Sequence, residues 1–260
     1  MSLPENEHLQ VAKRAARTAG QELRRRFDST DDFRYEGQRG VGEMVTPADE
    51  VVEEQIIADI SETFPDDNFM SEENHADFAI KPRWVVDPID GTTNFSNGLG
   101  HYSVSIAFEG KRRPDIGVVY YVPDDRMYTA VAGEGAYVDG ERLELTGPSN
   151  LTDALVVTGF NSKQLEKNHM RLITLLESTQ GIRRWGSAAA ELAFIADGSF
   201  DIYFERSIDK WDVYAGILVV REAGGAVTCI ETGNGIHYNY VLASPESLHQ
   251  DLVAVLSTDR

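Results

Sequence analysis

The stretch WVVDPIDGTTNF, residues 84–95, contains the pattern from which the fold and a candidate site can be inferred. Its first three residues are apolar and predict a short strand that runs into a core. Asp87-Pro88 and Asp90-Gly91 are turn-forming pairs, so we expect the strand to stop there. Two carboxylates therefore lie at the end of a buried strand.

Four acidic residues are close together in this part of the sequence. Glu72 and Glu73 precede Asp87 and Asp90, and each follows or ends a predicted element. Mg²⁺ prefers oxygen ligands in octahedral geometry, and two carboxylates near one strand end can hold one ion or bridge two. The alternative is that the aspartates are ordinary turn residues and the glutamates belong to a solvated loop. The pattern alone does not decide between these interpretations.

A glycine and two hydroxyl residues follow the acids. Gly91, Thr92 and Thr93 form a pattern in which backbone N–H groups can converge on an anion such as phosphate. Metal ions beside such a cradle are typical of phosphate-ester hydrolysis. Thr92 would then orient the attacking water, and an acid elsewhere would accept its proton.

The composition predicts a folded, acidic chain. Its 260 residues are 42% hydrophobic, which suffices for one large domain or two packed subdomains. The net charge is -19, and this charge repels nucleic acids and anionic membranes, so we expect neither as a partner. Arginine outnumbers lysine, and our hypothesis is a halophile-like surface in a salt-rich cytoplasm. The alternative is an acidic protein of a mesophile.

A single cysteine bears on the compartment. Cys229 has no partner for an intrachain disulfide, which indicates a reduced compartment, and its apolar neighbours predict a buried, inert thiol. The N-terminus lacks a signal-peptide pattern, and no apolar run approaches the roughly 18 residues of a membrane-spanning helix. We therefore expect a soluble, cytoplasmic protein.

The first half of the chain predicts an α+β arrangement. Apolar residues at three- and four-residue spacing indicate a helix over about 9–27, and Thr46-Pro47 begins a second helix with Thr46 as its N-cap. The connection over 28–45 is expected to be irregular. Strands follow at 101–108, 116–122, 127–132, 136–138 and 143–145, with a turn at Asp139-Gly140, and predict an antiparallel meander.

The second half alternates between strands and helices. Strands are predicted at 155–158, 182–185, 200–204, 226–230 and 240–243, and helices at 163–176, 188–196, 211–222 and from 245 onward. We therefore divide the chain into an α+β subdomain, 1–146, which carries the metal and phosphate motif, and an α/β subdomain, 147–260.

Several motifs together resemble one family. WVVDPIDGTTNF is similar to the signature of the inositol monophosphatase family, and WDVYAGILVVREAGG, residues 211–225, is similar to its second motif. TPAD at 46–49 and SEEN at 71–74 extend the resemblance to nearly the whole chain. It implies a layered α/β/α/β/α sandwich, a homodimer, and Mg²⁺-dependent, lithium-inhibited hydrolysis of small-molecule phosphate monoesters with two or three ions.

The resemblance also implies roles for individual residues. The implied metal ligands are Glu72, Asp87, the backbone carbonyl of Ile89, Asp90 and Asp212. The implied catalytic residues are Asp49, Glu72 and Thr92, of which Asp49 and Thr92 activate the water. The implied phosphate and substrate contacts are Asp90, Gly91, Thr92, Gly186, Ser187, Ala188 and Glu205. We expect Asp90→Asn to abolish turnover with little loss of fold.

Four of these residues also have a purely structural interpretation. Asp49 could be the acidic member of a capping box with Thr46, and Asp212 a helix N-terminal acid stabilised by the macrodipole. Ser187 could be the N-cap of the helix from Ala188, and both roles can hold at once. Glu205 could be a solvated acid at a strand end.

Departures from the family pattern bear on the substrate. Asp209 stands where animal members commonly carry a histidine, and the segment 37–42 offers Arg39 but no lysine. Arg183 and Arg184 could bind a second phosphate, because a guanidinium matches phosphate oxygens bidentately, or could form exposed ion pairs.

We expect a phosphoric monoester hydrolase that acts on inositol monophosphate. The alternatives are fructose-1,6-bisphosphatase activity or dual activity, as in archaeal relatives, and a non-catalytic regulatory binding protein. 3'-Phosphoadenosine 5'-phosphate phosphatase activity fits less well, because those relatives carry insertions that this compact chain lacks.

Overall fold

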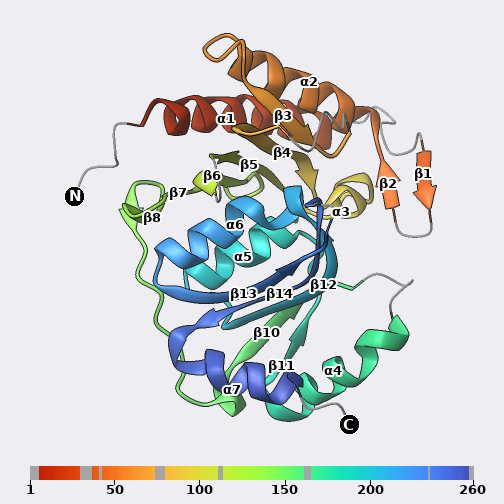
Figure 1. Cartoon of the computed structure of the whole chain (residues 1–260). Coiled ribbons are helices and arrows are strands. Elements are labelled where there is room, and N and C mark those ends of the chain that lie inside the picture. Colours follow the sequence, from red (N-terminus) through yellow and green to blue (C-terminus); the bar gives the residue numbers. More distant parts are fainter. Residues whose placement is uncertain are drawn as a thin grey trace.

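The computed structural model describes residues 6–29, 37–40, 43–73, 80–110, 114–160, 165–233 and 235–257. They form five layers, with two sheets separated by a pair of helices (Figure 1). Helices α1 (Glu7–Phe27) and α2 (Pro47–Ser61) cover the outer face of the first sheet. Helices α5 (Ala188–Ala196) and α6 (Lys210–Glu222) lie between the sheets, and α4 (Leu165–Ser178) and α7 (Glu246–Ser257) cover the second sheet. The predicted α/β/α/β/α sandwich is confirmed.

The first sheet has seven strands in the order in which they occur in the chain. They are β3 (Asn68–Ser71), β4 (Arg83–Asp90), β5 (Ser103–Glu109), β6 (Pro114–Tyr121), β7 (Arg126–Val131), β8 (Gly135–Val138) and β9 (Glu141–Arg142). Strand β3 pairs parallel with β4, and all later neighbours are antiparallel, so the predicted meander is confirmed. Asp139 and Gly140 both have positive φ, as the expected tight turn requires.

The second sheet has five strands in the order β11-β10-β12-β14-β13. They are β10 (Leu155–Thr158), β11 (Gly181–Arg183), β12 (Ile202–Asp209), β13 (Gly225–Glu231) and β14 (His237–Pro245). Strand β10 is parallel to β11 and β12, whereas β14 is antiparallel to β12 and β13. The predicted strands and helices of this half are present, with ends shifted by a few residues.

Alternation along β4 explains the continuous apolar run Trp84-Val85-Val86. Val85 packs in the core between the two sheets, whereas Trp84 and Val86 pack under α1 and α2. A strand covered on both faces needs apolar residues at every position. All eight residues of β4 are buried, and this strand delivers the two aspartates into the interior.

The expected stop at Asp87-Pro88 is wrong in detail. Strand β4 continues to Asp90, and its register with β5 shifts between Asp87 and Asp90. Pro88 cannot donate to the ladder, and proline is tolerated in a sheet at such an irregularity. Asp87-Pro88 therefore lies at an irregularity within the strand, and the strand ends at Asp90, before Gly91.

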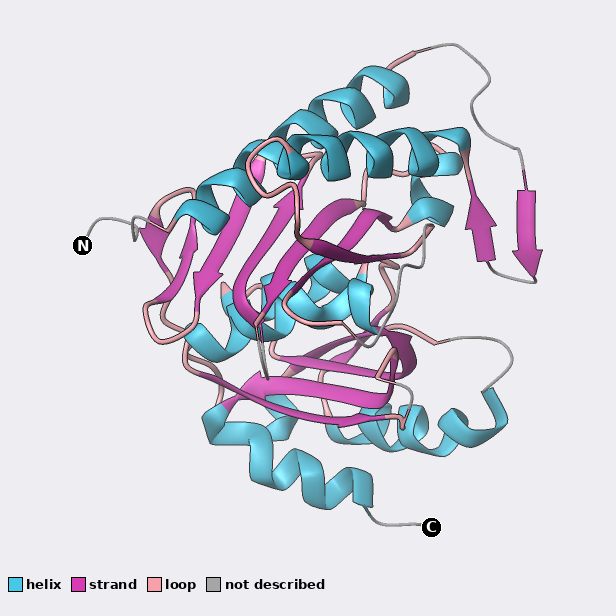
Figure 2. Cartoon of the chain, turned by 45° about the horizontal axis from the view of Figure 1, so that its top comes forward, coloured by secondary structure: helices cyan, strands magenta, loops and turns pink. Residues whose placement is uncertain are grey.

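Several short elements were not predicted. The hairpin β1 (Gly37–Gly40) and β2 (Glu43–Val45) lies within the segment expected to be irregular, and helix α3 (Thr92–Ser96) follows β4 directly. Figure 2 shows this hairpin at the side of the molecule, where β2 contacts α3. Strand β3 was also missed, whereas 143–145, predicted as a strand, is not one.

Two expectations about the surface can be compared with the structure. Cys229 on β13 is half-buried instead of fully buried, and the guanidinium of Arg221 lies 3.8 Å from its Sγ. Among the helices in the described ranges, none is both long enough and apolar enough to cross a bilayer.

Candidate functional site

The site forms where β4 ends and α3 begins. Gly91 connects them with a φ of +101°, and a Cβ atom there would lie 3.0 Å from the carbonyl oxygen of His101 and 3.1 Å from that of Gly186. Glycine is therefore required both by the backbone angle and by the close approach of two other segments. This approach brings the start of α5 against the end of β4.

Asp90 joins the first sheet to the central helical layer. Its carboxylate accepts hydrogen bonds from the hydroxyls of Ser103 (3.2 Å) and Ser187 (2.6 Å) and from the backbone N–H groups of Ala188 (3.0 Å) and Ala189 (2.7 Å). The pKa of Asp90 is nevertheless raised, because burial outweighs these bonds. The carboxylate satisfies N–H groups that otherwise lack partners at the start of α5.

The N-cap interpretation of Ser187 holds for its position but not for its side chain. Ser187 occupies the N-cap position of α5, but its side chain makes no cap hydrogen bond. Its hydroxyl instead donates to Asp90, the last residue of β4 in the first sheet, and Asp90 caps the helix. A cap supplied 97 residues away in sequence cannot be read from a local pattern.

Asp49 and Thr92 meet beside this junction. The hydroxyl of Thr92 lies 3.1 Å from Oδ1 of Asp49 and 2.8 Å from the carbonyl oxygen of Ile89. The other oxygen of Asp49, Oδ2, accepts from the backbone N–H (2.6 Å) and the hydroxyl (2.7 Å) of Thr46. Asp49 therefore takes part in the capping box of α2 and also contacts Thr92, so the structural and functional interpretations are compatible.

Burial sets the protonation of Asp49. Its side chain is 1% exposed, and this desolvation raises the pKa of the carboxyl despite hydrogen bonds from Thr46 and Thr92. A base whose pKa moves toward the working pH accepts a proton more readily.

Four carboxyl groups come together from three segments of the chain. The pKa of Asp87 lies well above its usual range, because the carboxyl is desolvated and three further carboxylates act on it, those of Glu72, Asp90 and Asp212. Asp87 and Asp212 also share a side-chain hydrogen bond. The pKa of Asp212 is raised by burial and by Asp209, Glu72, Asp90 and Glu205.

The donor set fits a hard divalent cation by its chemistry. The groups are oxygen donors, and their mutual repulsion is the kind that a divalent cation relieves. The side chains do not close around an ion as they stand: within the described ranges, no three His, Cys, Asp or Glu side chains form an arrangement that could hold a metal. In this geometry the carboxylate of Asp90 bonds to α5, and Asp87 bonds to Asp212.

Asp212 lies in the first turn of α6. The backbone N–H of Asp209 donates to its Oδ2 at 3.2 Å, so the helix-terminal interpretation of this acid also applies. Asp209 is the N-cap of α6, and the ring of His237 lies against its carboxylate.

Two glutamates, one on β12 and one on α5, lie near the acidic cluster. Glu205 on β12 accepts a hydrogen bond of 2.9 Å from the hydroxyl of Tyr203, and burial raises its pKa to about 7. Glu191 on α5 accepts from the N–H groups of Trp185 (3.0 Å) and Gly186 (2.8 Å), both at Oε1. Burial and the charge of Glu205 raise the pKa of Glu191 to about 8.

Glu191 was missed by the sequence analysis, although a signal existed. It is the one charged residue in the helix AAAELAFIA, all of which is buried. A buried acid in such a helix needs specific partners. These partners are the backbone groups of the Gly186 turn, so Glu191 holds the turn predicted to face the substrate.

Arg183 at the end of β11 and Arg184 after it differ in what they contact. The guanidinium of Arg184 lies 4.9 Å from the ring centroid of Phe160, and its charge lowers the pKa of Glu205. Arg183 donates to the carbonyl oxygen of Ile182 at 3.1 Å. The charge of Arg184 therefore acts on a residue of the candidate site. The side chain of Arg39 lies outside the described part of the structure.

Comparison with known proteins now places this geometry in a family. A family model described as "Inositol monophosphatase family" matches residues 5–259. The chain belongs to the inositol monophosphatase family. The resemblance stated from the motifs is thereby confirmed.

Individual members of the family are similar over almost their whole length. "Nus factor SuhB" of Haemophilus influenzae is 36% identical over 256 residues, covering 95% of each chain. "Inositol-1-monophosphatase" of Mesorhizobium japonicum is 35% identical over 253 residues, covering 94% of each. The solved structure of extragenic suppressor protein suhB from Bartonella henselae has a TM-score of 0.89 at 32% identity and covers 98% of this chain and 100% of that one. An inositol monophosphatase from Anabaena has a TM-score of 0.82 at 31% identity, over 95% and 94% of the two chains.

Proposed function

We propose that this chain is a Mg²⁺-dependent phosphomonoesterase whose preferred substrate is an inositol monophosphate. The observation that carries the proposal is the contact of 3.1 Å between the Thr92 hydroxyl and Asp49, beside four mutually repelling carboxyl groups. Membership of the inositol monophosphatase family supports a phosphatase.

Thr92 and Asp49 would prepare the attacking water. The single proton of the Thr92 hydroxyl points toward Asp49 or the Ile89 carbonyl, which leaves its oxygen lone pairs to accept a hydrogen bond from water. Asp49 is buried, and its raised pKa suits it to take the proton that the water loses. The hydrogen bonds from Thr46 fix the orientation of that carboxylate.

The acidic cluster would hold the metal. The proposed ligands are Glu72, Asp87, the carbonyl of Ile89, Asp90 and Asp212. When bound, Mg²⁺ supplies a lowered pKa for water and neutralises the charge that develops on phosphate and leaving-group oxygens.

Glu205 would bind the hydroxyl groups of the polyol part of the substrate. The N–H groups of Gly186 and Ala188 donate to Glu191 and Asp90. The carboxylate of Glu205 lies near the acidic cluster and can accept hydrogen bonds from ring hydroxyls. Gly159 permits its position, because a Cβ atom there would lie 2.2 Å from both carboxylate oxygens.

A bisphosphate is a second candidate substrate. Arg184 is close enough to Glu205 to lower its pKa, and its guanidinium offers a fork that matches a second phosphate. We propose fructose 1,6-bisphosphate, alone or with inositol phosphate, as this alternative. Side-by-side rates of phosphate release from inositol 1-phosphate and fructose 1,6-bisphosphate test both substrates.

A regulatory role without catalysis is the alternative from another class. Relatives from Haemophilus influenzae and Pasteurella multocida, 36% and 39% identical, carry the name "Nus factor SuhB", which mentions no phosphatase. The presence of Asp49, Thr92 and the acidic cluster favours catalysis. Absence of phosphate release with Mg²⁺ from every small phosphate monoester tried would favour the regulatory role.

The assembly and the compartment complete the proposal. We expect a homodimer in the cytoplasm, with a small-molecule phosphate as the partner and no nucleic-acid or membrane binding. Light scattering on the purified chain measures the dimer directly.

A further inference from the structure

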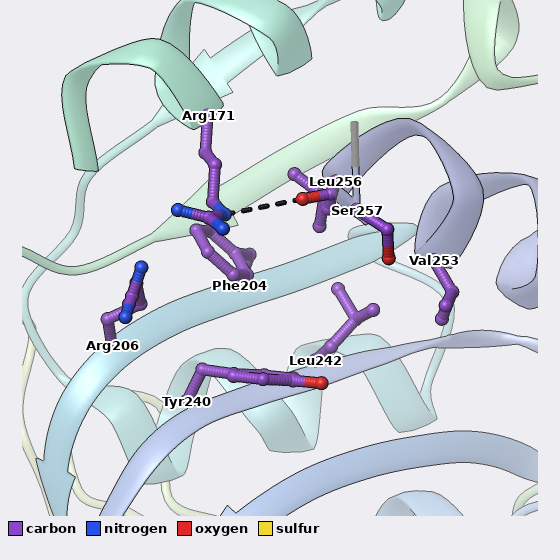
Figure 3. Close-up of a pocket in the computed structure, with 8 residues that line it drawn as sticks. All are labelled: Arg171, Phe204, Arg206, Tyr240, Leu242, Val253, Leu256 and Ser257. Atoms are coloured by element: carbon purple, nitrogen blue, oxygen red, sulfur yellow. Dashed lines mark hydrogen bonds between the residues drawn. The ribbon is translucent and has the colours of Figure 1, made fainter. Parts of the chain in front are cut away.

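A cavity opens on the outer face of the second sheet, away from the acidic cluster. Strands β12 and β14 form its floor, and helices α4 and α7 form its sides (Figure 3). Its volume is about 150 Å³, which is smaller than the roughly 300–1,000 Å³ of drug-sized ligand sites. The residues that matter for its chemistry are Arg171, Phe204, Arg206, Tyr240, Leu242 and Leu256.

Strand alternation separates this cavity from the proposed active site. Tyr203 packs with α5 and α6 between the sheets, and its hydroxyl bonds to Glu205 on that side. Phe204 packs in the other core, with α7, and Arg206 follows it on the same face. Adjacent residues of β12 therefore lie on opposite faces of the sheet, and Phe204 and Arg206 line this cavity.

Register places an aromatic ring beside the arginine. Phe204 pairs with Leu242, and Arg206 pairs with Tyr240, on neighbouring antiparallel strands. These four side chains form a floor that is apolar at one end and carries a ring and a guanidinium at the other (Figure 3).

Two guanidinium groups converge on the cavity. Arg171 on α4 donates through Nε to the carbonyl oxygen of Leu256 at 3.3 Å, which fixes its orientation (Figure 3). Nε of Arg206 is buried and has no hydrogen-bond partner among the described residues. A buried donor without a partner is destabilising, and a bound acceptor removes that cost.

The electrostatics point in the same direction. The pKa of Arg206 is lowered by burial and by the positive charge of Arg171, whereas Tyr240 raises it. None of these groups is a carboxylate, in a chain with 43 acidic residues. Two like charges beside one cavity repel each other, and a dianion between them relieves the repulsion.

We propose that this cavity binds a phosphate monoester whose organic part is an aromatic or other planar ring. A phosphate monoester carries close to two negative charges at neutral pH, which matches two guanidinium groups, and its oxygens fit their planar fork. The ring of Tyr240 and the apolar side chains of Phe204 and Leu242 would contact the planar part.

Binding of phenylphosphonate tests the proposal. This aryl dianion cannot be hydrolysed at its C–P bond, and isothermal titration into the full chain in EDTA suppresses the Mg²⁺-dependent phosphate site. We expect saturable binding that Arg206→Gln or Arg171→Gln weakens by about tenfold or more, since each removes a charge-assisted contact. Arg17→Gln removes an equal charge from the exposed pair with Asp125 on the opposite side of the molecule and should leave the affinity unchanged.

Two further measurements define the ligand and protect the test against misfolding. Tyr240→Leu should weaken phenylphosphonate but not methylphosphonate, which has no ring. Arg206→Lys keeps the charge and loses the fork, so its affinity should fall between wild type and Arg206→Gln; it serves if Arg206→Gln does not fold. Equal binding by wild type, Arg206→Gln and Arg206→Lys, or no binding by folded wild type at millimolar ligand, overturns the proposal. Because the titration contains no Mg²⁺ and no substrate, its result is independent of whether the chain hydrolyses phosphate esters.

Discussion

Oδ2 of Asp90 accepts a hydrogen bond of 2.6 Å from the hydroxyl of Ser187, 97 residues further along the chain. The same carboxylate caps α5 through two backbone N–H groups. One acid thus belongs to the proposed metal site and to the contact between the first sheet and the central helices. Changes to Asp90 therefore affect both catalysis and stability.

Asp90→Asn should abolish turnover and also destabilise the protein, in contrast to the small loss of fold expected from the sequence. Both carboxylate oxygens accept hydrogen bonds, and an asparagine offers only one acceptor, so at least one buried donor loses its partner. We expect a loss of about 1–3 kcal/mol in the free energy of unfolding, measured with urea. Asp251→Asn, at an exposed position on α7, is the control and should be neutral. Wild-type stability of Asp90→Asn would contradict this account of the cap.

Thr92→Val should lower kcat by about a hundredfold or more with little change in stability. The substitution removes the hydroxyl that contacts Asp49 and keeps the shape of a half-buried side chain. Thr93→Val, at the exposed neighbouring position, is the matched control and should keep most of the activity. Equal effects of the two substitutions on kcat would remove Thr92 from the mechanism.

Mg²⁺ should raise the thermal stability of the chain as well as support its activity. Neutralising the cluster of Glu72, Asp87, Asp90 and Asp212 relieves a repulsion that now raises the pKa values of its buried aspartates. The melting temperature, followed by circular dichroism, should rise with Mg²⁺, and Asp212→Asn should reduce that rise. Full hydrolysis in excess EDTA would contradict the proposed metal dependence.

Glu191→Gln should flatten the pH dependence of stability of the metal-free protein. The pKa of Glu191 is raised from 4.5 to about 8, mainly by burial, so the folded chain keeps a proton that the unfolded chain releases. The stability contribution of this group is constant below about pH 4.5 and decreases as the pH rises through about 8. Glutamine removes this titration and can still accept both N–H bonds, because both go to one oxygen. Urea unfolding at pH 6 and pH 8.5 measures the difference, with the exposed Glu177→Gln as control.

Arg184→Ala should reduce the rate on fructose 1,6-bisphosphate more than the rate on inositol 1-phosphate. The charge of Arg184 acts on Glu205, whereas the guanidinium of Arg183 donates to the carbonyl oxygen of Ile182. Arg183→Ala is therefore a matched control with the same loss of charge. Identical losses on the two substrates would exclude a specific contact between Arg184 and a second phosphate.

The sequence predicted best those parts of the molecule that local pattern determines. Helix α2 begins at Pro47 after Thr46, as its capping residues require, and α5 covers the predicted range 188–196. Strand β12 was predicted to end at Phe204, before a run of mostly polar residues, whereas it ends at Asp209. Pairing with β14 carries the strand to Asp209. Tertiary pairing, which one sequence does not display, thus overrides local polarity.

The acids of the candidate site were found through motifs, but their connections were not. Asp87 and Asp90 were recognised from the stretch at 84–95, whereas the cap of α5 by Asp90 and the support of the Gly186 turn by Glu191 depend on contacts between distant segments. The cavity at Arg206 was missed for the same reason as the end of β12. Without the strand, Glu205 and Arg206 have no defined faces.

The helical layer between the sheets has a further consequence for engineering. Ser187, at the start of α5, bonds to Asp90, and Trp211 on α6 accepts a hydrogen bond from Ser105, so both helices are joined to the first sheet. Glu205 belongs to the second sheet. If the chain were cut in the connection between β9 and β10, each fragment would contain only part of the candidate site. Restored turnover on mixing would then report reassociation, which makes this connection a rational position for a split reporter.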